Sequence, residues 1–150
     1  MLDKKGNHMT KQALVPIADG SEEIEAVTII DVLRRAGVEV TVASVGVGKT
    51  KQITAARGTT IVADSFIADC ADKAWDLIAV PGGIEGADHL AASEILDQLL
   101  RSQAQQGKFY AAICAAPAVV LGSKGLLADK TATSHPRFYQ SLIAKEVDTE

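Results

Sequence analysis

The sequence predicts a parallel α/β fold, and three observations support this prediction. Short apolar runs alternate with longer segments that carry helix signals, a spacing typical of strand–helix–strand units. Hydrophobic residues make up 47% of the 150 residues and aromatic ones only 4%, so the core must be mostly Ala, Val, Ile and Leu. That mixture favours helices packed on a parallel sheet over an antiparallel sandwich. The length suits one domain without internal repeats.

The first elements are expected in the following order. The apolar residues 12–18 predict a buried strand. A helix follows, with Ser21 as its N-cap, acidic residues in its first turn and Gly37 just beyond its end. The Val- and Thr-rich residues 38–45 predict a second strand. The apolar set expected on the helix comprises Ile24, Val27, Ile30 or Asp31, and Leu33.

The middle of the chain is expected to begin with a polar loop at residues 46–51. Two short strands should follow within 53–63, joined near Arg57-Gly58. A core strand is expected at residues 75–80, where Pro81-Gly82-Gly83 ends it. Ser93 should cap a helix that runs through Gln106 and stops at Gly107.

The last part should contain a strand at residues 109–113, with Cys114 at its end. A helix over 115–121 is expected next, with Pro117 near its first turn. Residues 130–134 predict a short strand, and residues 138–144 a helical turn or two.

Chemically useful residues follow several of these strands. Ligands of open α/β sheets bind beyond the carboxyl ends of the strands. The groups expected there are the segment 19–25 with Glu25, the pair Gly82-Gly83, Cys114, and Ser134-His135. A carboxylate, a glycine pair, a thiol and an imidazole should therefore converge on one edge of the sheet.

Cys114 is the strongest candidate for a reactive group. A thiol at a strand-to-helix junction feels the helix dipole and nearby backbone N–H groups, which should lower its pKa. The small residues Ala115 and Ala116 suit a tight turn like the nucleophile elbow of α/β hydrolases. The alternative interpretation is a buried structural cysteine.

Each companion residue also has two interpretations. Gly82 and Gly83 either present backbone N–H groups to an oxyanion or form a tight turn that needs positive φ. Glu25 either exchanges a hydrogen bond with the thiol or substrate, or is a first-turn acid, a role that suits Glu22 and Glu23 better. His135 is either a general base or a strand-end residue packed against Pro136.

Several classes of function are disfavoured. A net charge of −4 and a pI of about 5.4 provide no basic footprint for nucleic acid. The cysteines and histidines show no metal-ligand spacing, there is no nucleotide-binding motif, and no cofactor is expected. Cys70 is expected to be incidental in a polar loop, and His89 to lie on the surface.

The expected location is the cytoplasm. No apolar run is long enough to cross a membrane, and the first ten residues are too polar for a secretory signal. The two cysteines make no disulfide framework, so free thiols are expected. Residues 1–10 are interpreted as a tag or flexible N-terminus, and 11–150 as the domain.

Four motifs together resemble the DJ-one/ThiJ/PfpI superfamily, and most closely its DJ-one and YajL branch. They are ALVPIADGSEEIEAVTIIDVLRRAGVEVTVASV with the later Arg57-Gly58 turn, DLIAVPGGIEGADHL, YAAICAAPAVVL, and TSHP. The resemblance implies a flavodoxin-like three-layer α/β sandwich and a homodimer. Cys114 would be the oxidation-prone cysteine, hydrogen-bonded by Glu25, with oxyanion-type N–H groups from Gly83 and Ala115.

The resemblance also implies that His135 is the nearby imidazole and that Arg57, contributed by the partner subunit, helps to form an anion pocket. Arg35 would lie near the dimer interface. Members of the superfamily commonly continue for several dozen residues beyond the position of Glu150, so this chain is expected to be truncated at its C-terminus, exposing apolar surface and a strand edge. Ala115 stands where protease-like branches carry His, so peptidase activity is not expected.

Two functions follow from the resemblance. The first is a cysteine-dependent enzyme without cofactor, of glyoxalase III or deglycase type, that acts on reactive dicarbonyls such as methylglyoxal or on glycated substrates. The alternative is an oxidative-stress sensor or holdase chaperone that uses oxidation of Cys114.

Overall fold

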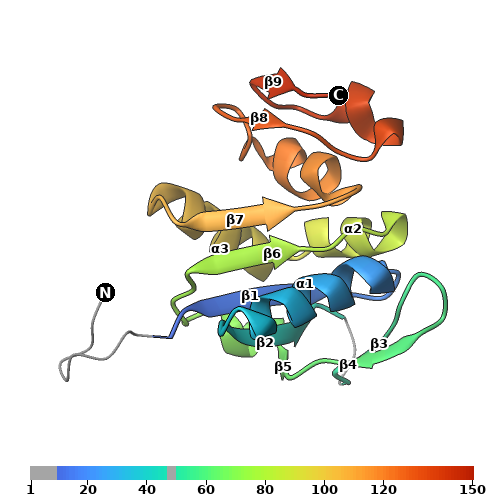
Figure 1. Ribbon diagram of the computed structural model, residues 1–150, viewed down its shortest axis with the longest axis vertical. Coiled ribbons are helices and arrows are strands. Elements are labelled where there is room, and N and C mark those ends of the chain that lie inside the picture. Colours follow the sequence, from blue (N-terminus) through green and yellow to red (C-terminus); the bar gives the residue numbers. More distant parts are fainter. Residues whose placement is uncertain (1–9, 47–49) are drawn as a thin grey trace.

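The computed structural model describes residues 10–46 and 50–150, and its centre is a parallel sheet. Its five strands lie in the order β5-β2-β1-β6-β7 (Figure 1). All neighbouring strands pair in parallel. The strands are β1 (Gln12–Ile17), β2 (Glu39–Ser44), β5 (Ser65–Phe66), β6 (Leu77–Val80) and β7 (Phe109–Ala112). The predicted α/β class with a mostly parallel sheet is confirmed.

Helices cover both faces of the sheet and make the three layers. Helix α1 (Glu23–Arg35) packs on one face, and α2 (Ile84–Ala91) and α3 (Glu94–Gln105) pack on the other (Figure 1). Side chains of β1 alternate between two separate cores, with Val15 in one and Leu14 in the other. Burial on both faces explains why β1 is a continuous apolar run in the sequence.

Helix α1 begins one residue later than expected and buries a different stripe. Glu22 is its N-cap, while the Ser21 hydroxyl accepts a hydrogen bond from Ala18 N instead. Ala26 is buried, but Ile24 and Val27, expected on the buried side, are 74% and 51% exposed. The expected apolar set is therefore wrong at its first two positions, because the side of α1 that packs on the sheet carries Ala26, Ile29, Ile30 and Leu33.

The two short strands predicted within residues 53–63 form a hairpin of β3 (Gln52–Thr54) and β4 (Thr60–Val62). Gly58 in its turn has φ +89°, which explains a glycine there. The hairpin projects beside the carboxyl ends of β1 and β6 (Figure 1). The loop expected at 46–51 lies partly outside the described residues, and residues 1–9 of the expected tag lie wholly outside them.

The segment 64–107 contains one helix that was not expected. Helix α2 follows Gly83 directly and is too short to show a clear apolar period. Helix α3 is capped by Ser93 as predicted, and Gly107 follows it with φ +64°. Cys70 ends a short 3₁₀ helix (Ile67–Cys70) and is fully buried, so its expected place in a polar loop is wrong.

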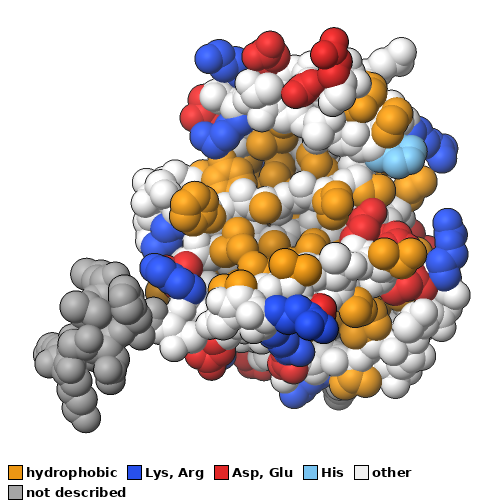
Figure 2. All heavy atoms as spheres, in the orientation of Figure 1, with side chains coloured by type: hydrophobic (Ala, Val, Ile, Leu, Met, Phe, Trp, Pro, Cys, Tyr) orange, Lys and Arg blue, Asp and Glu red, His pale blue; other side chains and the backbone are white. Residues whose placement is uncertain are grey.

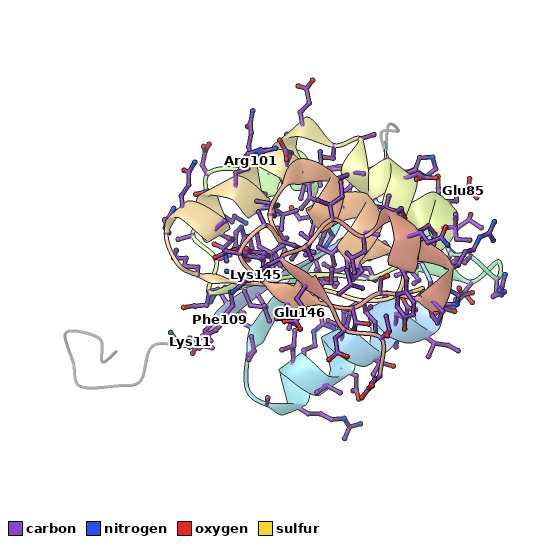
Figure 3. The ribbon with its side chains drawn as sticks, turned by 90° about the horizontal axis from the view of Figure 1, so that it is seen from above. Lys11, Glu85, Arg101, Phe109, Lys145 and Glu146 are labelled. Carbon is purple, nitrogen blue, oxygen red and sulfur yellow. The ribbon has the colours of Figure 1, made fainter. Side chains whose placement is uncertain are left out.

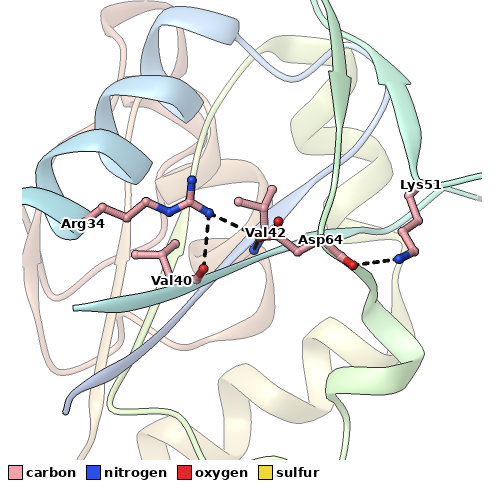
Figure 4. Close-up of polar contacts among 5 residues, drawn as sticks. All are labelled: Arg34, Val40, Val42, Lys51 and Asp64. Atoms are coloured by element: carbon pink, nitrogen blue, oxygen red, sulfur yellow. Dashed lines mark hydrogen bonds and ion pairs between the residues drawn. The ribbon is translucent and has the colours of Figure 1, made fainter. Parts of the chain in front are cut away.

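Asp64 joins the hairpin to the edge of the main sheet. Its carboxylate accepts hydrogen bonds from Val42 N (2.9 Å) and Arg34 (3.4 Å), while its carbonyl oxygen accepts one from Lys51 Nζ (2.8 Å) (Figure 4). The free N–H of Val42 is thus satisfied just before β5 begins to pair with β2.

The last part of the chain forms a smaller unit at the β7 end of the sheet. Residues 115–121 hold only a short helix (Pro117–Leu121), followed by 3₁₀ turns at Gly122–Lys124 and Pro136–Ser141. Strand β8 (Thr131–Ala132) pairs with β9 (Glu146–Val147) in a separate small sheet. The strand expected at 130–134 therefore exists in part, but it does not join the main sheet as expected. In Figure 3, Glu85 marks the carboxyl edge of the sheet, opposite Lys11 and Phe109.

An apolar band is exposed on the face that carries α1. Helix α1 covers β1 and β2, but β7 leaves Phe109 76% and Ile113 47% exposed. Figure 2 shows apolar side chains gathered across this face, between α1 and the β8–β9 unit. Among the described residues, no helix combines the length and apolar character needed to cross a bilayer.

Candidate functional site

Cys114 lies two residues after the end of β7, in a strained backbone conformation. Its φ is +62°, and within the described residues it is the one non-glycine with positive φ. Three hydrogen bonds hold the turn: Ile113 N to Val80 O, Ala116 N to Ile113 O, and His135 N to Cys114 O at 2.7 Å. Such strain persists only where the surrounding structure enforces it, and it is typical of functional sites.

Glu25 reaches the same place from the first turn of α1. Its Oε2 accepts a hydrogen bond from Gly82 N at 2.8 Å, and its carboxylate contacts the thiol of Cys114. A Cβ on Gly82 would lie 2.6 Å from Cys114 Cβ and 2.7 Å from Glu25 Oε2. Gly82 is therefore a glycine because the thiol and the carboxylate occupy the space of a side chain.

The pKa of the Cys114 thiol is raised, contrary to the sequence expectation. Burial is the largest cause, and the nearby Glu25 carboxylate adds to it. Backbone N–H groups of Gly83 and Ala115 act in the opposite direction. The expected effect of a helix dipole is weak here because the following helix has only 5 residues and begins at Pro117.

A main-chain hydrogen bond from His135 N to Cys114 O holds His135 beside Cys114. The strand before His135 does not lie in the main sheet and so does not place it there. His135 and Cys114 line one cavity, and Nδ1 of His135 accepts a hydrogen bond from Arg137 N at 3.2 Å. In a neutral ring the proton therefore lies on Nε2, which leaves Nε2 as the hydrogen-bond donor of the ring. The ring also packs edge-on against Phe138, with centroids 6.4 Å apart.

Arg57 lies in the β3–β4 turn and lines the cavity beside Cys114 within the same chain. The expectation that a partner subunit supplies Arg57 is therefore wrong: the hairpin of this chain brings it to the site. Glu23 accepts hydrogen bonds from Arg57 N with both carboxylate oxygens, at 3.0 and 3.1 Å. Glu23 is thus more than a first-turn acid that complements the helix dipole.

The cavity has a volume of about 340 Å³. Its predicted lining residues are Cys114, Gly83, His135 and Arg57. Sequence reasoning missed Glu85 and Phe138, which also line it, because helix α2 and the Phe138 turn gave weak patterns. Glu25 lines a second hollow of about 300 Å³ on the other side of Cys114.

The remaining candidates lie elsewhere. His89 is exposed, with Nδ1 2.9 Å from the carbonyl oxygen of Asp19. Burial raises the pKa of the Cys70 thiol as it does that of Cys114, but Cys70 is fully buried in the core, where no substrate reaches it. In residues 10–46 and 50–150, no three His, Cys, Asp or Glu side chains gather in a way that could hold a metal ion.

Comparisons with known proteins agree with this fold and these motifs. Residues 11–150 match the DJ-1/PfpI family. Protein DJ-1 homolog B of Arabidopsis thaliana is 47% identical over 133 residues, 89% of this chain and 30% of the relative. The glutathione-independent glyoxalase DJR-1.2 of Caenorhabditis elegans is 36% identical over 121 residues, 80% of this chain and 62% of the relative.

A solved structure shows the same backbone. Oxidized DJ-1 of Toxoplasma gondii superposes with a TM-score of 0.88 at 44% identity, over 94% of this chain and 76% of that one. The chain spans about a third of the two plant DJ-1 homologs, 30% and 32% of their lengths. Since the family match covers nearly all of the sequence and the fold agrees, the chain belongs to the DJ-1/PfpI family.

Proposed function

We propose that this chain is a cysteine-dependent enzyme without cofactor that acts on reactive dicarbonyls or their early adducts and converts methylglyoxal to lactate. The contact between Glu25 and Cys114 carries the proposal, because Cys114 lines the larger cavity and shares the smaller hollow with Glu25. The relative from C. elegans that is named a glutathione-independent glyoxalase supports the same class of reaction. A protein thiol that attacks the aldehyde itself takes the place of glutathione.

In the first step the thiol of Cys114 gives its proton to Glu25, and the sulfur attacks the aldehyde carbon. This transfer removes the carboxylate charge that raises the pKa of the thiol, so the two events assist each other. The oxygen of the adduct faces the N–H groups of Gly83 and Ala115 and takes the proton back from Glu25. The product is a neutral hemithioacetal, and Glu25 is again a carboxylate that can act as a base. Both N–H groups already lie close enough to the sulfur to lower its pKa.

In the second step a proton moves from the former aldehyde carbon to the neighbouring ketone carbon. Glu25 carries this proton, and His135 donates a hydrogen bond through Nε2 to the developing oxygen charge. The aldehyde carbon is thereby oxidised to a thioester and the ketone carbon reduced to an alcohol. Water then cleaves the thioester, releasing lactate and the free thiol, so no outside oxidant or reductant is needed.

Lactate formation from methylglyoxal tests the proposal directly. Cys114→Ser should abolish turnover, and Glu25→Gln should lower kcat by about 100-fold or more, the usual contribution of a general acid–base group. Cys70→Ala is the matched control, because it also removes a sulfur but lies in the core away from the cavity. Undiminished turnover in Cys114→Ser would refute this mechanism.

The proposed assembly is a homodimer formed through α1. Ile24, Val27 and Val32 of this helix are exposed, which is unusual for a stable surface helix. Arg35, which the resemblance places near the interface, pairs with Asp31 at 2.7 Å on the same helix. Val27→Asp should convert a dimer to a monomer in sedimentation equilibrium, whereas Ile143→Asp, at another exposed apolar residue, should not.

A second candidate function is that of an oxidative-stress sensor or holdase chaperone that uses oxidation of Cys114. It is favoured by the likeness to the T. gondii protein solved in oxidized form. A sulfinate on Cys114 would lie against the N–H groups of Gly83 and Ala115. Mass spectrometry after mild peroxide should then find Cys114 oxidised first, and oxidation of buried Cys70 before Cys114 would contradict the sensor role.

A further inference from the structure

The β3–β4 turn is docked on the segment that leads from β1 into α1. Thr54 is held on both sides, since its N–H donates to Asp19 Oδ1 (2.7 Å) and its carbonyl accepts from Gly20 N (2.9 Å). Ala56 N donates to Ser21 O at 2.9 Å. These contacts fix the base of the turn, so the position of its tip depends on what holds the residues after Ala56.

Glu23 holds the tip. Both of its carboxylate oxygens accept from the backbone N–H of Arg57, at 3.0 and 3.1 Å. Burial acts to raise the pKa of Glu23, but hydrogen bonds from its own N–H, from Thr59 and from Arg57 lower it overall, so the carboxylate stays ionised at neutral pH. The charge-assisted contact is therefore present under the conditions of an assay.

The contact uses the main chain of Arg57 and leaves its side chain available. In the part of the chain that the structure describes, no carboxylate lies within ion-pair distance of the Arg57 guanidinium. The residue lines the cavity of Cys114 and is exposed to solvent there. A cation without a partner at the mouth of a cavity attracts anions toward the thiol.

Helix geometry explains how one turn serves both walls of the cavity. Residues two positions apart point about 200° away from each other around a helix. Glu25 therefore faces Gly82 and Cys114, whereas Glu23 faces the hairpin. The first turn of α1 thus sets the distance between Cys114 on one side of the cavity and Arg57 on the other.

We propose that Glu23 is a positioning residue: by holding the Arg57 turn against α1, it gives the Cys114 thiol a preference for electrophiles that carry a carboxylate or phosphate over neutral ones. The inference rests on Cys114 being the reactive thiol of the proposed function. It predicts that loss of the Glu23 carboxylate lowers the preference for anionic reagents, although a negative charge has been removed. Removing the negative charge of Glu23 should by itself favour anions, whereas releasing Arg57 should disfavour them.

The experiment compares two alkylating reagents of similar size, anionic iodoacetate and neutral iodoacetamide. In both reactions the sulfur of Cys114 bonds to the methylene carbon of the reagent, iodide leaves and the thiol proton passes to solvent. Mass spectrometry of the full chain gives the two rate constants at Cys114, and their ratio cancels changes in the thiol's own reactivity. Arg57→Ala should lower the iodoacetate-to-iodoacetamide ratio by about threefold, the effect of one charge at moderate distance in water.

Glu23→Ala should lower the ratio as much as Arg57→Ala does, and the double variant should show no further fall. Glu23→Gln, which keeps one acceptor oxygen, should retain or exceed the ratio of the unmodified chain. Glu85→Gln is the matched charge control, because Glu85 lines the same cavity without a described hydrogen bond to the hairpin, and it should only raise the ratio. If Glu23→Ala melts below the assay temperature, Glu23→Ser supplies the same truncation.

The possible failures are distinct. A ratio that is unchanged or raised in the truncated variants, as in Glu85→Gln, would overturn the positioning role. A Cys114 that reacts with neither reagent in the unmodified chain would overturn both this inference and the proposed thiol chemistry. Reactive Cys114 with the expected ratios but no lactate from methylglyoxal would overturn the proposed enzyme alone.

Discussion

The strained backbone at Cys114 leads to a prediction about stability that does not depend on any substrate. A non-glycine residue in the left-handed region costs about 1–2 kcal/mol relative to the right-handed one. Cys114 has φ +62°, whereas glycine adopts this conformation without the penalty. Glycine also loses about 0.4–1 kcal/mol more conformational entropy on folding than alanine. The balance is about 0.5–1 kcal/mol in favour of glycine.

We therefore expect Cys114→Gly to be more stable than Cys114→Ala by about 0.5–1 kcal/mol, or about 1–4 °C in Tm for a chain of this size. Comparing Gly with Ala, and not with Cys, removes the effect of the sulfur and its contacts. Urea unfolding followed by circular dichroism measures the difference, provided that both variants show the same slope against denaturant.

Ala111→Gly provides the control with opposite sign. Ala111 is exposed within β7, a regular strand, so glycine there should lower the free energy of unfolding by about 0.5–1 kcal/mol. If Cys114→Gly were also less stable than Cys114→Ala, the left-handed backbone would not be a source of strain. Backbone strain would then give no reason to regard this turn as maintained for its function.

Three further predictions concern a glycine beside Cys114 and two residues at the opposite edge of the sheet. Gly82→Ala should destabilise the fold by about 1–3 kcal/mol and alter the rate of Cys114 alkylation, because the new Cβ would lie 2.6 Å from Cys114 Cβ. Gly46→Ala is the control: its Cβ would lie 3.5 Å from Ser44 Oγ, so the free energy of unfolding should change by less than about 0.5 kcal/mol. Hydrogen bonds from the N–H of Gln12 and then from Lys11 lower the pKa of Asp76. The ionised Asp76 therefore stabilises the fold above about pH 4, by less than about 1 kcal/mol for this half-exposed group, and this contribution is lost as the pH falls through the lowered pKa. Acid unfolding of Asp76→Asn should lack this component. Phe109→Lys should leave Tm nearly unchanged and reduce binding of a hydrophobic dye, because Phe109 is 76% exposed, and a large loss of Tm would show that it is packed in solution.

The sequence predicted most of the fold because its strongest patterns arise from burial. Strand β1 is buried on both faces, so its run of apolar residues needs no further context. Ser93 and Gly107 mark the ends of α3 through local capping and backbone preferences. Such signals depend on near neighbours in the chain, which is why they can be interpreted without tertiary structure.

The errors occurred where tertiary contacts override local preference. Ser21 is a good N-cap by composition, but its hydroxyl bonds Ala18 N in a buried turn and Glu22 caps the helix instead. The exposed Ile24 and Val27 looked like core residues, because sequence does not distinguish a buried apolar stripe from an exposed one. The pKa of Cys114 was expected to be lowered but is raised, because the motif does not indicate how deeply the thiol is buried.

The three acids at the start of α1 show how the site depends on more than a helix dipole. Loops that pass the carboxyl edge of the sheet present backbone N–H groups that have no partner in a strand. Glu22 accepts from Glu25 N, Glu23 from Arg57 N, and Glu25 from Gly82 N, each at about 3 Å. Each carboxylate therefore satisfies a different segment, and only the third also contacts the thiol. It follows that exchanging these acids should have three separable effects, on the helix start, on the hairpin and on the chemistry of Cys114.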